Sequence, residues 1–202
     1  ACLVGSEMCI RDKFNYYGAP DADRVIVAMG SVCDTIQETV DFLNARGEKV
    51  GMVKVHLYRP FSAKHLLAAL PETVKHISVL DRTKEPGSLG EPLFLDVVAA
   101  LKGSAFNDVP VYGGRFGLGS KDTVPAHIIA VYNNMAAPQP KPEFTLSIED
   151  DVTHLSLPVT ENPDTTPAGT TSCKFWGLGS DGTVGANKDS IKTVSYTHLT
   201  LP

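Results

Sequence analysis

The alternation of strand-like and helix-like segments between residues 24 and 135 is the sequence feature that most constrains the fold. Short apolar runs rich in β-branched residues alternate there with segments whose apolar residues recur at helical spacing. The strand-like runs are residues 24–29, 49–57, 76–80 and 109–112, and the helix-like segments are residues 32–46, 62–70, 92–101 and 123–135. This order predicts an α/β domain of three layers, in which a parallel sheet is covered by helices on both faces.

The chain changes character after the last of these helices. A proline-rich connector at residues 136–142 leads to an apolar run at 143–148, three acids at 149–151 and a second apolar run at 152–159. This order predicts a strand pair joined by an acidic turn. A divalent-metal site at the three acids is the alternative, but the turn is favoured because no second cluster of oxygen ligands accompanies them. Threonines and prolines at residues 160–171 then predict an extended linker.

A glycine-rich turn near the end of the chain predicts a small anion site. Gly177, Gly179 and Gly182 stand at G-x-G-x-x-G spacing between an aromatic pair and a helix that starts at Thr183. Missing side chains let backbone N–H groups approach a ligand, and the positive end of a helix favours a phosphate. A tight turn without a ligand explains the same residues. The acid about 20 positions further on that accompanies a dinucleotide site is absent from the sequence.

Three further turns are candidates, because ligands of parallel sheets usually bind beyond the carboxyl ends of the strands. These turns are residues 30–31, 81–90 and 113–121. Charged side chains suggest anion binding in the last two, namely Asp81, Arg82, Lys84 and Glu85 in one and Arg115 and Lys121, with the hydroxyl of Ser120, in the other. For residues 81–90, a loop held by internal ion pairs is the favoured interpretation. For residues 113–121, packing against a neighbouring domain is favoured. Neither contains a catalytic set.

Composition excludes several classes of protein. The 202 residues have a net charge of −5 and show no basic cluster, which argues against a nucleic-acid or anionic-membrane partner. No apolar run approaches the roughly 20 residues that a membrane span needs. The four cysteines show neither a C-x-x-C pair nor metal-ligand spacing, so we expect neither a disulfide framework nor an iron–sulfur site. The expected location is the reducing cytoplasm.

Both ends of the chain differ from ordinary protein sequence. Residues 1–11 lack an initiator methionine and a basic region of the kind that begins a secretory signal. Residues 195–202 place β-branched residues after a helix and stop at a proline. Both strings resemble translated sequencing-adapter sequence, so we expect that neither is natural protein. We therefore expect the chain to be an internal fragment.

Six strings of residues, taken in order, resemble the pyruvate:ferredoxin (flavodoxin) oxidoreductase family, the long single-chain form of pyruvate synthase. They are APDADRVIVAMGSVCDTIQETVDFLNARGEKVG, VHLYRPF, VLDRTKEPGSLGEPLFLDV, GGRFGLGSKD, IEDDVTHLSLP and KFWGLGSDGTVGANKDSIK. The resemblance implies that residues 12–142 form the family's second domain, which is similar to the C-terminal domain of transketolase. Residues 143–172 would be the strand pair and linker. Residues 173–194 would open the third domain, which is related to the γ subunit of multi-subunit 2-oxoacid oxidoreductases.

The resemblance implies a parent enzyme that decarboxylates pyruvate on thiamine diphosphate with Mg²⁺. It passes electrons through [4Fe–4S] clusters to ferredoxin or flavodoxin and transfers the acetyl unit to coenzyme A. The chain matches none of the segments that hold thiamine diphosphate, magnesium or the clusters, so we expect no catalytic residue in it and no activity of the fragment alone. The remaining domains of the parent, in a homodimer, are the expected partners.

The third domain of the family contributes to the coenzyme A site, which places the expected contacts in the glycine turn. The residues so implied are Gly179, Ser180, Asp181, Gly182, Thr183, Asn187 and Lys188. Two alternatives stay open. The chain is a fragment of another 2-oxoacid:ferredoxin oxidoreductase, or it is a stand-alone α/β binding module.

Overall fold

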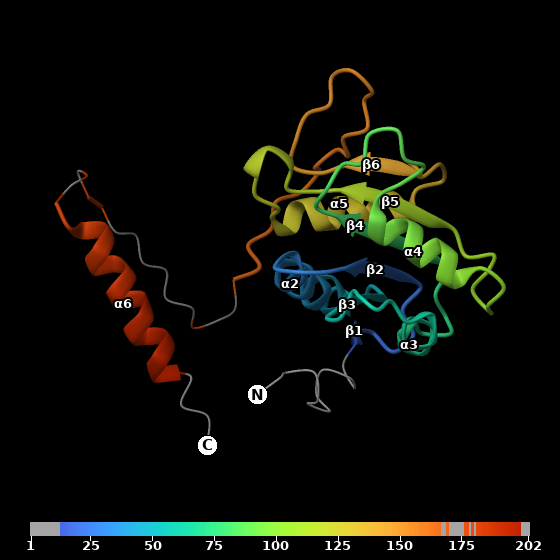
Figure 1. Cartoon of the computed structure of the whole chain (residues 1–202), viewed down its shortest axis with the longest axis horizontal. Helices are drawn as coiled ribbons and strands as arrows, with labels where there is room; N and C mark the ends of the chain where they lie inside the picture. Colours follow the sequence, from blue (N-terminus) through green and yellow to red (C-terminus); the bar gives the residue numbers. More distant parts are fainter. Residues whose placement is uncertain (1–12, 167–168, 170–175, 178, 180, 199–202) are drawn as a thin grey trace. The chain divides into compact units, whose positions relative to one another are not determined.

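A computed structural model of the chain describes residues 13–166, 169, 176–177, 179 and 181–198 (Figure 1). The chain divides into two compact units, Ala1–Thr165 and Thr166–Pro202. The expected terminal additions at residues 1–11 and 199–202 lie outside the described residues, and residues 195–198 continue a helix of the second unit. Each unit is considered by itself.

The first unit is built on one six-stranded sheet with the strand order β1-β3-β2-β4-β5-β6. The strands are β1 (Phe14–Gly18), β2 (Arg24–Ala28), β3 (Val50–Val55), β4 (His76–Asp81), β5 (Val111–Arg115) and β6 (Glu143–Thr145). β1 runs antiparallel to β3, and every other neighbouring pair is parallel. The sheet is therefore parallel except at one edge.

Helices cover both faces of this sheet (Figure 1). The helices are α2 (Val32–Ala45), α3 (Ala63–Ala69), α4 (Pro92–Leu101) and α5 (Pro125–Ala136), and the short 3₁₀ turn η2 (Leu118–Ser120) follows β5. The apolar side chains of α2 and α5 pack on one face and those of α3 and α4 on the other. The predicted three-layer α/β fold is confirmed.

The central strand β2 is apolar at every position after Arg24. Val25, Ile26, Val27 and Ala28 are all fully buried. Ile26 and Ala28 belong to the core beneath α2 and α5, whereas Val25 and Val27 belong to the core beneath α3 and α4. Because successive side chains of a strand point to opposite faces, a strand covered on both faces favours apolar residues at consecutive positions.

Two parts of the sheet differ from the sequence prediction. β1 was not predicted, and it adds the antiparallel edge through pairs such as Phe14 with Val55. β6 was predicted to pair with a following strand, but it pairs in parallel with β5 as the sixth strand. Residues 152–159 form no strand and contribute one bridge, between Ser156 and Thr145. The first compact unit runs to Thr165 and so includes β6.

The second unit contains one described helix, α6 (Thr183–His198). It begins directly after the glycine turn, as the sequence predicts. In the part of the chain that the structure describes, no helix combines the length and the apolar character that crossing a membrane requires.

Adjacent glycines in β5 give a test of the packing. A methyl group on Gly114 would lie 2.4 Å from Phe144 Cε2 and 2.6 Å from Leu80 Cδ2, and both of these side chains are fully buried. We expect Gly114→Ala to lower the free energy of unfolding by about 1–3 kcal/mol, the usual cost of overpacking a core. Urea denaturation of the purified chain measures this change.

The matched control is Gly113→Ala. Its methyl group would face the opposite side of the sheet, 3.3 Å from the ring edge of the partly buried Phe94, which can shift. A much smaller loss of stability is expected. Equal losses for the two variants would show that the Gly114 site is not tightly packed.

Candidate functional site

The predicted anion site lies in a glycine turn that leads directly into α6. Gly179 and Gly182 have φ values of +83° and +82°, in the left-handed region that glycine adopts without strain. A Cβ on Gly177 would lie 2.9 Å from the Cβ of Thr183, so the turn folds back closely on the first residue of α6. The glycines are required by backbone shape and by space.

A carboxylate of the turn itself already binds at the start of α6. Asp181 Oδ1 accepts a hydrogen bond from the backbone N–H of Thr183 at 3.0 Å. This N–H was predicted to face a bound phosphate. The turn thus binds a negative charge where one was expected, and that charge belongs to Asp181 in this structure.

The other predicted contacts lie near this helix start, except for Ser180, which is outside the described residues. Asn187 is one turn after Thr183 on the same helix face and is partly buried. Lys188 follows it and is exposed. The described part of the turn therefore offers a short polar face with one cation beside it.

A second candidate lies in the first unit, at the carboxyl ends of its parallel strands. A cavity of about 410 Å³ is bounded by three chain segments that are distant in sequence. Its lining residues are Ser31, Val32, Thr35, Arg82, Phe116, Gly117, Lys121, Asp122, Thr123 and Val124. The three turns that the sequence singled out thus meet at one cavity.

The charged side chains next to this cavity do not form the ion pairs that were expected among Asp81, Arg82, Lys84 and Glu85. Asp81 is buried, and its two carboxylate oxygens accept the N–H groups of Leu93 and Phe94, each at 3.1 Å. It therefore caps α4. Burial raises the pKa of Asp81, and these two hydrogen bonds act against that shift.

Arg115 also has a structural partner. Its Nε donates to Glu91 Oε1, and Glu91 Oε2 accepts the backbone N–H of Glu85 at 2.8 Å. Glu91 is 4% exposed, so a buried carboxylate is balanced by a guanidinium. Arg115 is thus not available to an external anion, contrary to one of the possibilities that the sequence left open.

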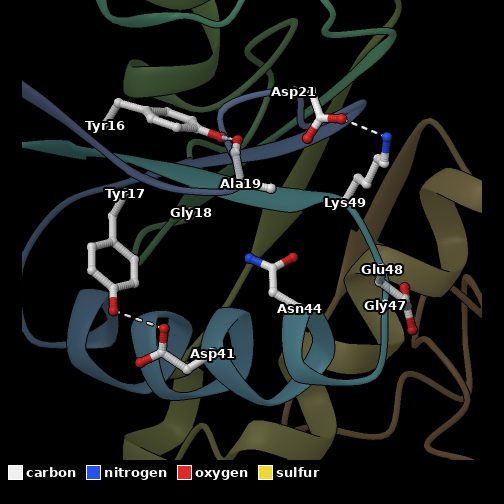
Figure 2. Close-up of a pocket in the computed structure, with 10 residues that line it drawn as sticks. All are labelled: Tyr16, Tyr17, Gly18, Ala19, Asp21, Asp41, Asn44, Gly47, Glu48 and Lys49. Atoms are coloured by element: carbon white, nitrogen blue, oxygen red, sulfur yellow. Dashed lines mark hydrogen bonds and ion pairs between the residues drawn. The ribbon is translucent and has the colours of Figure 1, made fainter.

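A larger hollow of about 660 Å³ lies at the opposite edge of the sheet, between β1, the end of α2 and the start of β3 (Figure 2). The polar groups that line it bind one another. Tyr17 donates to Asp41 at 2.7 Å, and Lys49 donates to Asp21 at 2.5 Å. Figure 2 shows both contacts as dashed lines across the hollow.

Two more side chains of this hollow are held by backbone. The Asn44 amide bonds the N–H and the C=O of Val50, each at 3.0 Å, and the Tyr16 hydroxyl donates to the carbonyl of Ala19. Burial, and then the nearby Asp21 charge, raises the pKa of Tyr16 to about 12. These contacts fix β1 to β3 and α2, so the hollow serves the fold.

The three acids at residues 149–151 form a tight loop. The carboxylate of Asp150 accepts the N–H groups of Val152, Thr153 and Leu155 at 2.9–3.2 Å, as well as the Thr153 hydroxyl. Because these N–H groups bind Asp150, they cannot join a ladder, which explains the missing strand. Among the described residues no group of His, Cys, Asp and Glu side chains could hold a metal ion.

The Asp150 loop predicts a pH dependence. The Thr153 hydroxyl, and then the backbone N–H groups, hold the pKa of Asp150 well below its usual range. Its stabilising contribution is therefore complete above the unfolded value of about 3.9 and is lost only as pH falls through the lowered pKa. We expect the amide NMR signals of Val152, Thr153 and Leu155 to stay unchanged from neutral pH down to about 3.9.

Asp150→Ala should move these amide signals towards random-coil chemical shifts at neutral pH. It should also increase proteolytic cleavage within residues 146–157. Asp151→Ala is the matched control, because the exposed Asp151 accepts none of these bonds. The loop does not depend on the Asp150 carboxylate if both variants are cleaved at the same rate.

Comparison with known proteins gives a match to a family model. The model of the pyruvate:ferredoxin oxidoreductase core domain II matches residues 22–128. That range begins just before β2 and ends within α5, so it contains most of the sheet and all three turns at the cavity.

Individual relatives extend the match along the chain. A pyruvate-flavodoxin oxidoreductase of Enterobacter agglomerans is 63% identical over 195 residues, which are 96% of this chain and 16% of the relative. A pyruvate:ferredoxin oxidoreductase of Moorella thermoacetica is 61% identical over 181 residues, 90% of this chain and 15% of the relative. The chain spans about a sixth of the length of these relatives.

Among solved structures, a 2-oxoglutarate:ferredoxin oxidoreductase from Magnetococcus marinus, with 2-oxoglutarate, coenzyme A and succinyl-CoA bound, is similar with a TM-score of 0.45. The sequences are 18% identical, and the match covers 61% of this chain and 20% of the other.

Proposed function

The chain belongs to the pyruvate:ferredoxin oxidoreductase family, and from this we propose that it is a segment of an enzyme that oxidatively decarboxylates pyruvate. With coenzyme A the reaction yields acetyl-CoA and CO₂, and the electrons reduce ferredoxin or flavodoxin. The observation that carries the proposal is the 63% identity over 96% of the chain to a relative of which it spans 16%. That both relatives are named for pyruvate favours pyruvate over other 2-oxoacids.

The first compact unit supplies a scaffold in this proposal, similar to the C-terminal domain of transketolase. Asp81 caps α4, Arg115 pairs with Glu91, and Tyr17 binds Asp41, which supports a structural role for these side chains. The second unit, from about residue 173, opens the third domain of the parent. The isolated chain is therefore inactive, and the remaining domains, in a cytoplasmic homodimer, complete the enzyme.

Thiamine diphosphate, Mg²⁺ and the [4Fe–4S] clusters belong to those other domains. The residues that the structure describes do not fit a metal ion or an iron–sulfur cluster. No described group of donors could hold a metal, and the thiol of Cys33 is buried, with its pKa raised to about 11 by that burial. A cluster ligand must be a thiolate, which such a site disfavours.

Coenzyme A binds, in this proposal, with a phosphate at the glycine turn. The backbone N–H groups of Asp181, Gly182 and Thr183 face the phosphate, with Asn187 and Lys188 beside it; Ser180 was also expected to contribute and lies outside the described residues. Because Asp181 accepts the Thr183 N–H, its carboxylate must turn aside when the phosphate binds. Two anions at one helix start would repel each other, so the Asp181 carboxylate occupies the phosphate position only when coenzyme A is absent.

The test uses the complete enzyme, obtained by recovering the full reading frame. We expect pyruvate-dependent and coenzyme A-dependent reduction of ferredoxin or flavodoxin. Lys188→Gln should raise KM for coenzyme A about fivefold with little change in kcat, because an exposed cation on a phosphate contributes about 1 kcal/mol of binding.

Lys102→Gln is the control, since Lys102 is an exposed lysine that follows α4 in the first unit. Equal KM values for the Lys188→Gln variant and the unmodified enzyme would refute the placement of coenzyme A at the turn. Absence of pyruvate oxidation by the complete enzyme would refute the proposed activity.

A further inference from the structure

Arg82, at the cavity of the first unit, is an arginine without an acidic partner among the described residues. Five arginines lie in the part of the chain that the structure describes, and four of them bind carboxylates. These four are Arg24 with Asp23 and Glu48, Arg46 with Glu161, Arg59 with Asp96, and Arg115 with Glu91 and Glu143. Arg82, within the described chain, has no carboxylate at ion-pair distance, and it lines the cavity.

The loop after β5 positions this side chain. A Cβ on Gly117 would lie 2.9 Å from Arg82 Nε and 3.4 Å from its Cγ and Cδ, so the stem of Arg82 lies against the glycine backbone. Gly117 also has a φ of +64°, where another residue would be strained. Any other side chain at position 117 would displace Arg82 from the cavity wall.

A second cation faces the same space. Lys121 lines the cavity and, among the described residues, has no ion-pair partner. One acid, Asp122, also lines it, so the cavity has a net positive charge. The first turn of α2 contributes little, because the N–H groups of Cys33 and Asp34 already bind the carbonyls of Gly30 and Ser31. The charge of the cavity comes from side chains.

The remaining walls fit a small molecule. Thr35 and Ser31 offer hydroxyls, whereas Val32 and Phe116 give an apolar side. The volume of about 410 Å³ is in the usual range for ligand sites. The cavity also lies where the sheet order reverses: β2 is followed in sequence by β3 on one side of it, whereas its other neighbour is β4, and residues after both β2 and β4 line the cavity. Ligands of α/β sheets collect at such a reversal.

We propose that this cavity binds a small molecule that bears a phosphate group, with Arg82 and Lys121 as its cationic contacts. The hydroxyl of Thr35 accompanies them, and the apolar part of the ligand lies against Val32 and Phe116. A guanidinium offers paired N–H groups that match a phosphate. This site uses none of the residues of the glycine turn and goes beyond the proposed oxidoreductase activity.

The test is an NMR titration of the ¹⁵N-labelled 202-residue chain with inorganic pyrophosphate, against sodium chloride at equal ionic strength. We expect saturable shifts at the amides of Val32, Gly117 and Thr123, with a dissociation constant of about 1 mM. Arg82→Gln and Lys121→Gln should each weaken this binding about tenfold. Arg46→Gln, which changes an exposed arginine that does not line the cavity, should leave it unchanged.

Separate signals distinguish this site from the glycine turn. Shifts at Gly182 and Thr183 report the turn, and Lys188→Gln should affect those alone. The proposal is overturned if the cavity amides do not saturate, if sodium chloride shifts them equally, or if both cavity variants bind pyrophosphate as the unmodified chain does. It is also overturned if the complete parent enzyme excludes pyrophosphate from these residues, because an acidic side chain of a neighbouring domain would then occupy the cavity.

Discussion

The buried end of β4 is the point on which the first unit depends. The carboxylate of Asp81 accepts two N–H groups at the start of α4, and its carbonyl accepts the N–H of Phe116 after β5. One residue thereby joins the sheet, a helix on one face and the loop that forms the cavity. Removing it would leave buried donors without partners, which costs more than the bonds themselves contribute.

The distribution of charge follows from the same constraint. Buried or partly buried acids are used inside the unit, Asp81 at a helix start and Glu91 against Arg115. Asp150 organises its loop, and Asp181 does the same for the helix of the second unit. Among the residues that the structure describes, no carboxylate lies at ion-pair distance from Arg82 at the carboxyl edge. An unpaired guanidinium held against a glycine is thus the product of how the other charges are satisfied.

Much of the fold could be predicted, because local periodicity reports burial. The run at residues 24–29 became β2, and the helical spacing after Val32 became α2. β1 was missed because Phe14–Gly18 alternates only weakly and an edge strand is defined by its partner. The strand expected after the acidic turn does not form, because the side chain of Asp150 accepts N–H groups of that segment. Such local hydrogen bonds compete with the hydrogen bonds between strands.

The sequence by itself determined the three-layer class, the family and the positions of the turns, since apolar spacing and glycine placement are local properties. Only the tertiary structure decided that residues near 31, 82 and 117 share one cavity, and that Arg115 is engaged while Arg82 is not. It also decided that Asp81 caps α4 instead of pairing with its neighbours in sequence. These outcomes depend on strand register and on which charges become buried, and both arise only when distant segments pack together.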